Sequence, residues 1–296
     1  IPEDRVEEIE GGKIEDGDTA EGGVTAWAKC SLGTTPPVDW LMNMPQGVSY
    51  VDGAFWFWRR VGDKHGPATF DFNELPLALI ASAGITSANI EFVPGEIEVD
   101  TIKAPVNFGF RFVGELTTLI AVSGKSIFEL AGEYDTEGQQ QGAVVVWENL
   151  TFTCREEHAA DRWGGAIRME GGAMQVVNCT FTDCFADDYG GAIFAFGLER
   201  DSSITGCRFE RCFADGMYGY GGAIYASSKV VGHAEVDARV RLTVSSSTFA
   251  NNAAVNGGAI CTMRDANVDD LINEQPIELV ISQTGFLENA AEYDGG

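Results

Sequence analysis

The hydrophobic pattern in the second half of the chain repeats at intervals of roughly 30 to 40 residues, which is typical of a repeat protein. Each repeat contains a phenylalanine with a second apolar residue five positions before it. Because side chains on one face of a strand recur every two residues, this odd spacing requires a bend between the two positions. The pattern therefore predicts two short strands joined by a bend in each repeat. The pairs are Trp147 and Phe152, Val176 and Phe181, Ile204 and Phe209, Val244 and Phe249, and Ile281 and Phe286.

The string Gly-Gly-Ala-Ile follows four of these phenylalanines after a polar turn, at residues 164–167, 190–193, 221–224 and 257–260. Glycine adopts backbone conformations that other residues rarely adopt, so the glycine pair predicts a second bend. From the isoleucine onward the apolar residues alternate again, which predicts a third strand. Three short strands form one coil of a solenoid, and each coil stacks on its neighbours to bury its apolar edge. We therefore expect an all-β solenoid with three parallel sheets.

These markers resemble the repeats of the chlamydial polymorphic outer-membrane proteins, whose GGAI and FxxN motifs mark the coils of a right-handed parallel β-helix like that of pectin lyase. The marked resemblance covers residues 144–296. Asn252 and Asn289 stand three residues after phenylalanine, as in FxxN, whereas Cys184 and Cys212 stand there in two other repeats. The resemblance implies a right-handed parallel β-helix, a secreted or cell-surface location, and motifs that serve the fold rather than an activity.

The first 88 residues lack these markers. Residues 1–23 are polar and acidic and predict an extended linker or arm. Residues 24–88 are rich in aromatic side chains and predict a cap on the end of the solenoid. Within the cap, Asp52-Gly53 before an aromatic run indicates a β-hairpin, and Asn73 is a candidate N-cap for a short capping helix that reaches Ala83. Strand-like runs resume at Asn89, so we place the β-helix at residues 89–296.

Charge and composition narrow the classes of function. The formal net charge of −26 disfavours binding to nucleic acid or to anionic membrane surfaces. No run approaches the roughly 18 consecutive apolar residues that a membrane-spanning helix needs. Ile1 is not a start methionine, so we expect a cleaved leader or an upstream segment.

Four of the seven cysteines occupy two repeated positions. Cys179 and Cys207 lie two residues before the phenylalanine of their repeats, and Cys184 and Cys212 lie three residues after it. In stacked coils the members of each pair would be about 4.8 Å apart, which a disulfide tolerates. Two interpretations stand: the inter-coil disulfides Cys179–Cys207 and Cys184–Cys212 formed in an oxidising compartment, or a column of buried free thiols.

Two further sets of polar residues allow both a functional and a structural interpretation. Asn149 and Asn178 begin N-glycosylation sequons three residues before phenylalanine, or they form an inward asparagine column at the bend, which we favour. Asp187 and Asp215 share one register before Gly-Gly and are weak candidates for Ca²⁺ ligands, with a solvated acidic turn as the alternative. We expect no other cofactor.

Pectin-lyase-like helices include polysaccharide lyases and hydrolases, so we also consider an enzyme. Asp187-Asp188, Gly232-His233 and Arg239–Arg241 are similar in order to the motifs of polygalacturonase-like enzymes. His233 lies inside an insertion of the repeat, and a strongly negative surface would repel a polyuronate. We therefore expect no catalytic residues.

Phe194, Phe196 and Tyr225 follow the Gly-Gly-Ala-Ile strings and would form an aromatic stripe on the outer face of one sheet. We expect a non-enzymatic extracellular or cell-surface module with a structural or adhesive role in a larger chain or assembly. Its partners would be protein subunits or surface glycans. The alternative is a carbohydrate-binding module, or a polysaccharide lyase or hydrolase. Unpaired strand edges at the C-terminal end of the solenoid predict that further coils or another subunit cover it.

Overall fold

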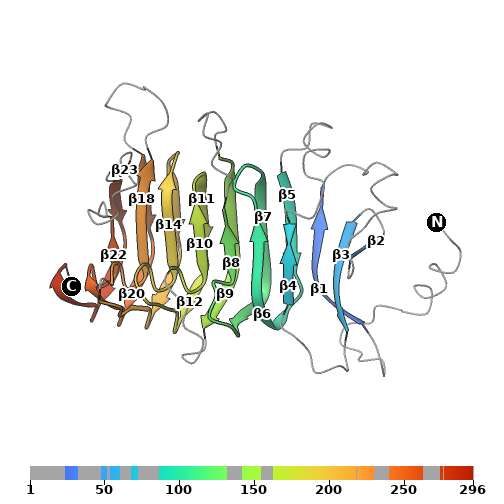
Figure 1. The fold of residues 1–296 in the computed structure, drawn as a ribbon, viewed down its shortest axis with the longest axis horizontal. Coiled ribbons are helices and arrows are strands. Elements are labelled where there is room, and N and C mark those ends of the chain that lie inside the picture. The colour runs from blue at the N-terminus through green and yellow to red at the C-terminus, as the bar shows by residue number, and fades with distance from the viewer. Residues whose placement is uncertain are drawn as a thin grey trace, which may run out of the picture.

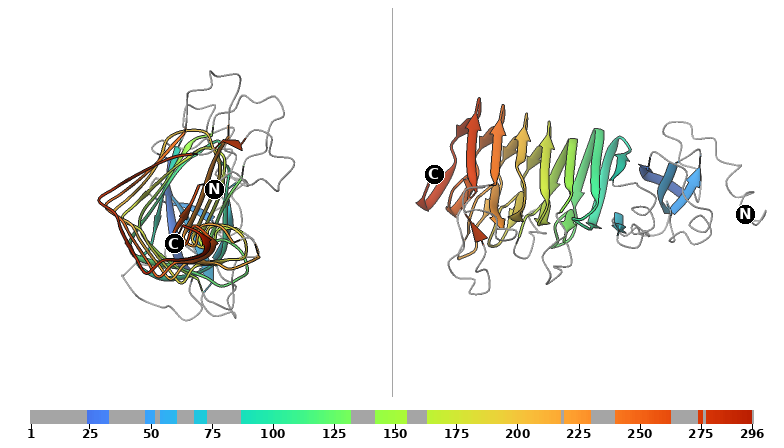
Figure 2. Two further views of the ribbon diagram at one scale, coloured as in Figure 1. Left: turned by 90° about the vertical axis from the view of Figure 1, so that its left-hand side faces the viewer. Right: turned by 90° about the horizontal axis from the view of Figure 1, so that it is seen from above.

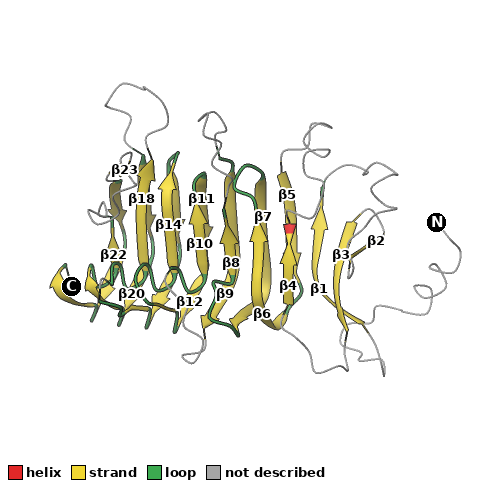
Figure 3. Ribbon diagram, viewed as in Figure 1, coloured by secondary structure: helices red, strands yellow, loops and turns green. Residues whose placement is uncertain are grey.

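The computed structural model is built almost entirely of β-strands (Figure 3), and its described residues contain no α-helix; the short red segment in Figure 3 is Phe72, which is in a 3₁₀ conformation. The structure describes residues 24–32, 48–51, 54–60, 68–72, 87–131, 142–154, 163–217, 219–229, 240–262, 274–275 and 277–295. The acidic arm at 1–23 and the capping helix expected from Asn73 to Ala83 lie outside these residues.

The strands stack in register, one above another, so that successive coils eclipse each other when viewed along the stack (Figures 1 and 2). The strand pairs that stack consecutive coils are parallel from β5 (Ser87–Phe92) to β26 (Ala290–Asp294), apart from the short strand β23 (Glu274–Gln275), which pairs antiparallel with Ser228 and Lys229. The chain is therefore a parallel β-helix, as the repeat predicts.

Three long sheets form the walls of the β-helix. The first, called here the GGAI sheet, contains β4 (Ala68–Asp71), the end of β6 (Gly95–Ala104), β8 (Phe128–Leu130), β10 (Ile167–Glu170), β14 (Ile193–Leu198), β18 (Ile224–Lys229) and β22 (Ile260–Cys261). The middle sheet contains β5, the start of β7 (Gly109–Ala121), the start of β9 (Val144–Cys154), β11 (Ala173–Val177), β15 (Ser202–Thr205), β19 (Arg241–Ser245) and β24 (Glu278–Ser282).

The third wall, called here the Phe sheet, contains the start of β6, the ends of β7 and β9, β12 (Thr180–Thr182), β16 (Arg208–Glu210), β20 (Thr248–Ala250) and β25 (Gly285–Leu287). A shorter fourth sheet follows it in the repeated coils and contains β13 (Phe185–Ala186), β17 (Phe213–Ala214), β21 (Ala253–Asn256) and β26. The sequence pattern predicted three strands in each coil and missed this short sheet, because its strands lie in the polar turn between phenylalanine and Gly-Gly.

Antiparallel strands extend the N-terminal end of the stack. β1 (Val24–Ser31) pairs with β5 on one side and with β3 (Ala54–Arg60) on the other, and β2 (Val48–Val51) pairs with β3. Val51 opposes Ala54 across Asp52-Gly53, which confirms the predicted hairpin. The first parallel strand, β4, already lies within the segment that we assigned to the cap. Because this coil lacks both repeat markers, the sequence pattern does not reveal it.

Residues in the left-handed conformation turn the chain at two corners of each repeated coil. The corner between the middle and Phe sheets is formed by five residues with φ between 50° and 68°: Asn149, Asn178, Gly206, Ser246 and Gln283. The corner after the Phe sheet is formed by four residues with φ between 52° and 55°: Asp183, Arg211, Asn251 and Glu288. These corners separate the apolar residues of each repeat at their odd spacing, so that both point into the core.

The repeated phenylalanines form a ladder inside the β-helix. Neighbouring rings from Phe152 to Phe286 are 4.6, 4.6, 4.7 and 5.1 Å apart between centroids and nearly parallel. The four rings from Phe152 to Phe249 are fully buried. Stacked aromatic rings add to the free energy of hydrophobic burial, so the ladder stabilises each coil on the next.

The two glycines of each Gly-Gly-Ala-Ile string serve different purposes. The first, such as Gly190, has a positive φ of 58°, which side chains disfavour. The second, such as Gly191, lies against the backbone, where an added Cβ would be 2.3 Å from the carbonyl oxygen of Gly222 and 2.5 Å from that of Phe213. The string thus permits a sharp turn and then a close approach between coils.

Candidate functional site

An interior ladder of polar side chains, called here the corner ladder, runs along the corner that follows the Phe sheet. Asn252 accepts a hydrogen bond from the backbone N–H of Cys212 at 2.9 Å, and its Nδ2 donates to the carbonyl of Phe209 and to Oδ1 of Asn289. Asn289 Nδ2 donates to the carbonyl of Phe249 at 3.0 Å. The asparagines of FxxN therefore satisfy backbone groups at the corner.

Thiols replace the amides in the preceding coils of this ladder. Cys154, Cys184 and Cys212 are buried, and the Sγ atoms of Cys154 and Cys184 are 3.0 Å apart. The N–H of Phe213 donates to the carbonyl of Cys184 at 2.9 Å, which places Cys184 beside Cys212 on the next coil. The structure thus brings together the predicted neighbours Cys184 and Cys212, and it adds Cys154, which we had not assigned to the ladder.

The second cysteine pair lies at the other corner of the Phe sheet. Cys179 and Cys207 lie on consecutive coils, since the N–H of Arg208 donates to the carbonyl of Cys179. Both thiols point toward backbone carbonyls, those of Val177 and Thr205 at 3.4 Å. Ser247 continues the column and accepts a hydrogen bond from the N–H of Cys207. All seven cysteines are buried, and none of them is in a disulfide in this structure.

Burial raises the pKa of the thiols of Cys30, Cys179, Cys184 and Cys207, because a thiolate loses solvation inside the β-helix. The pKa of Cys207 rises to about 11 and that of Cys30 to about 12. Burial and the neighbouring thiols of Cys154 and Cys212 also raise the pKa of Cys184 well above its usual range. These four thiols are therefore protonated and unreactive at neutral pH in the folded chain.

The inward asparagine column that we favoured for Asn149 and Asn178 is wrong. Both residues are exposed corner residues with left-handed backbones. Asparagine adopts this conformation more readily than most residues, which explains its position. The inward asparagines are instead Asn252 and Asn289, and the sequons of Asn149 and Asn178 project from the surface.

The candidate Ca²⁺ ligands lie in exposed turns. Asp187 and Asp215 precede the short loops that lead to Gly-Gly, and the carbonyl of Asp187 accepts a hydrogen bond from the N–H of Gly216. Within the described part of the chain no three His, Cys, Asp or Glu side chains gather to hold a metal ion. Of the residues weighed for an enzyme, Asp188 lies in the same turn, Arg241 pairs with Glu278 at 3.2 Å, and Gly232-His233 lies outside the described residues.

An aromatic cluster covers the outer face of the GGAI sheet, on the side opposite the core. Phe194 and Tyr225 are adjacent on β14 and β18, with ring centroids 5.6 Å apart. Trp163 stacks on Phe194 at 5.7 Å, and Tyr189 packs edge-on against Tyr225 at 5.0 Å. We call this set the outer aromatic cluster; it comprises Trp163, Tyr189, Phe194, Phe196, Tyr220, Tyr225 and Cys261.

The outer aromatic cluster corrects the predicted exposed stripe. Phe194 and Tyr225 are 6% and 2% exposed, and Phe196 is half-buried. Trp163, Tyr189 and Tyr220 cover them, because each of these residues directly precedes Gly-Gly and the turn carries its ring back over the sheet. The signal that sequence reasoning missed is this aromatic residue before Gly-Gly in three of the repeats. Arg168 completes the cover, with its guanidinium carbon 4.2 Å from the centroid of Trp163.

The comparisons with known proteins agree with the repeat. A family model for the Chlamydia polymorphic membrane protein repeat matches residues 246–263, which include Phe249, Asn252 and the last Gly-Gly-Ala-Ile string. The matched residues include all of β20, β21 and β22, so the chain is similar to that family over the part of one coil that builds the corner ladder. No curated protein and no solved structure matches the chain. The described residues include no helix with the length and apolarity to span a membrane.

Proposed function

We propose that this chain is a non-enzymatic β-helical module displayed at the cell surface, where it acts as a structural or adhesive element. The observation that carries the proposal is that the residues matched by the polymorphic membrane protein repeat are those that build and stack the coil. A pectin-lyase-like arrangement of coils would suit this role, because a stack of coils projects a long rigid surface.

The charge of the chain supports a role in contact with water and ions. Exposed arginines form ion pairs with carboxylates on neighbouring coils, as Arg111 does with Glu148 and Arg211 does with Asp183. With a net charge of −26, a large excess of carboxylates remains. Such a surface favours solubility and repels polyanions, which supports a scaffold rather than a polyuronate-binding enzyme.

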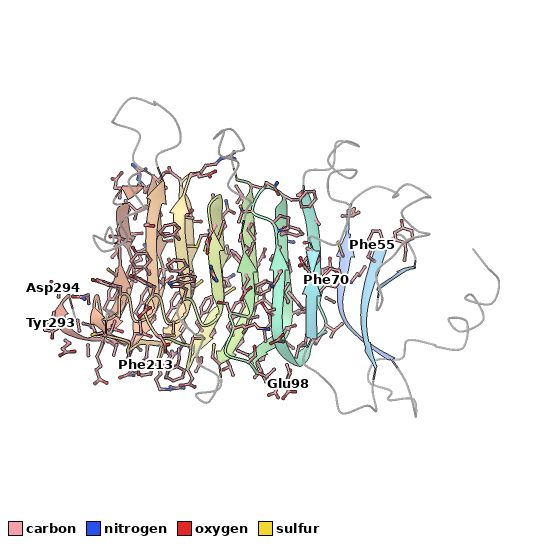
Figure 4. The ribbon with its side chains drawn as sticks, in the orientation of Figure 1. Phe55, Phe70, Glu98, Phe213, Tyr293 and Asp294 are labelled. Atoms are coloured by element: carbon pink, nitrogen blue, oxygen red, sulfur yellow. The ribbon has the colours of Figure 1, made fainter. Side chains whose placement is uncertain are left out.

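The coil of β24, β25 and β26 suggests how the module contacts a partner. Its large apolar side chains Ile281, Phe286, Leu287 and Tyr293 are 44% to 73% exposed, and Tyr293 and Asp294 lie at the end of the stack far from Phe55 (Figure 4). Phe286 and Asn289 stand at the positions through which each internal coil contacts the next coil. We infer that a coil of the same repeat type, from further along the chain or from another subunit, packs on this face.

The carbohydrate-binding alternative loses its main support. Sugar-binding aromatic residues offer an open ring face, whereas Phe194 and Tyr225 are buried and Tyr189 and Tyr220 stack on each other at 5.5 Å. The exposed sequons of Asn149 and Asn178 instead suit a surface protein that carries glycans.

Surface display can be tested on intact cells of the source organism. Antibodies raised against the folded chain should label cells that have not been permeabilised, and brief external proteolysis should remove the label. An antibody to a cytoplasmic protein serves as the control for cell integrity. Labelling that requires permeabilisation would show that the proposal is wrong.

A further inference from the structure

The thiol section of the corner ladder holds one contact that the repeat register does not predict. Cys154 and Cys184 approach to 3.0 Å between Sγ atoms, only about 1 Å more than a disulfide bond. Their strands are direct neighbours, since Phe152 of β9 pairs with Phe181 of β12. By contrast, the thiols of Cys179 and Cys207 are directed at backbone carbonyls.

We propose that Cys154 and Cys184 form a disulfide that joins two consecutive coils, and that Cys212 remains a free thiol beside it. Repeat alignment misses this pair because the two cysteines differ in their offset from phenylalanine. Cys154 follows Phe152 by two residues at the end of β9, whereas Cys184 follows Phe181 by three, beyond the left-handed corner residue Asp183.

The reaction is a thiol–disulfide exchange with an external disulfide as oxidant. The thiolate of one cysteine attacks the oxidant and forms a mixed disulfide, releasing one thiol. The thiolate of the other cysteine then attacks the protein sulfur of that mixed disulfide and releases the second thiol. Two S–H bonds and one S–S bond are lost, and one S–S bond and two S–H bonds form. The two cysteines are oxidised and the oxidant is reduced by two electrons.

This exchange must precede the closing of the coils. Cys154 and Cys184 are 3% and 0% exposed, and burial keeps the thiol of Cys184 protonated, so an oxidant cannot reach a reactive thiolate in the folded β-helix. For the same reason, the disulfide would be shielded from reductants once the chain has folded. The link therefore reports an oxidising compartment during folding.

Peptide mapping of the full 296-residue chain tests the pairing. The protein is folded with oxidised glutathione and then unfolded by a denaturant in the presence of an alkylating reagent, which blocks the free thiols. It is then digested with trypsin and with a protease that cleaves before aspartate. Cleavage at Arg168, Arg200 and Arg208 and before Asp183 separates Cys179, Cys184, Cys207 and Cys212. A peptide joining Cys154 to Cys184 is expected. Cys184 recovered as an alkylated thiol, or joined to Cys212, would overturn the proposal.

Two serine variants distinguish the effect of the Cys154–Cys184 disulfide from the effect of thiol packing in the corner ladder. Oxidised and reduced forms of each protein are compared by their urea midpoints, so that the cost of the substitution itself cancels. The oxidised form should unfold at higher urea in the wild type and in Cys212→Ser, and this gain should vanish in Cys154→Ser. A gain that persists in Cys154→Ser, or that is lost in Cys212→Ser, would contradict the assignment. Either result leaves the surface-display test unaffected.

Discussion

The early coils and the repeated coils fill the same interior with different side chains. In the repeated coils, the aromatic ring comes from the Phe sheet, and neighbouring rings of the Phe152–Phe249 ladder are within 5° of parallel. In the early coils Leu119 takes the ladder position, opposite Phe152, and the rings come from other walls, as with Phe112 and Phe128. Phe128 meets its neighbours at angles between 51° and 79°.

This difference shows that the β-helix requires a filled interior rather than a particular motif. Protein interiors are close-packed, so each coil must supply a similar side-chain volume. The repeated coils concentrate that volume in one phenylalanine and balance it with Val, Ile and Ala on the other walls. The early coils distribute it, and the sequence repeat is lost although the strand pairing continues.

The largest effect is expected where the backbones of the repeated coils meet. Gly191→Ala should cost about 4 kcal/mol or more, because its Cβ would collide with backbone carbonyls that cannot move independently. In the early coils Gly114→Ala should cost less, since its nearest atom is the terminal Cδ2 of Leu150 at 2.5 Å. Urea unfolding measures both, with Gly285→Ala, which meets nothing within 4 Å, as the control. Equal losses at Gly191 and Gly114 would show that the two regions tolerate close approach alike.

Making the early coils resemble the repeat should destabilise them. Leu119→Phe extends the phenylalanine ladder by one coil, but the interior there is already filled, so we expect a cost of about 1 to 3 kcal/mol. Adding Phe128→Leu should restore part of the loss by returning volume. Urea midpoints of the single and double variants test this, and a stabilised Leu119→Phe protein would refute the idea that volume limits these coils.

The two halves of the corner ladder should also differ in strength. Asn252→Ala leaves the N–H of Cys212 without its 2.9 Å partner inside the β-helix, which should cost about 1 to 2 kcal/mol. Cys212→Ala removes only long thiol contacts of 3.7 and 3.8 Å and should cost less. Thermal or urea unfolding compares them, and a larger loss at Cys212 would place the stronger interaction in the thiol half.

The smallest effect concerns the cover of the outer aromatic cluster. Arg168→Ala removes a partly exposed cation–π contact with Trp163 and an ion pair with Glu170, so a loss of about 0.5 to 1 kcal/mol is expected. Arg168→Lys keeps a cation but not the flat guanidinium, and it serves as the matched control. Tryptophan fluorescence of the folded protein should shift in Arg168→Ala if the ring of Trp163 becomes more exposed. An unchanged spectrum and stability would show that the arginine only borders the cluster.

Local pattern in the sequence determined the solenoid in the second half of the chain. Phenylalanine, the apolar residue five positions earlier and Gly-Gly each impose a local requirement of side-chain alternation or backbone conformation, and such requirements are readable from neighbouring residues. The hairpin at Asp52-Gly53 was predictable for the same reason.

Contacts between coils decided the remaining features. The direction of a corner side chain depends on the backbone angles of its own coil, so Asn149 and Asn178 point outward although other asparagines point inward. Burial of Phe194 and Tyr225 depends on aromatic rings that a tight turn returns over the sheet. The proximity of Cys154 to Cys184 depends on a corner residue that changes the register between two strands. Each of these features joins residues from different strands or coils, and only stacking in three dimensions brings them together.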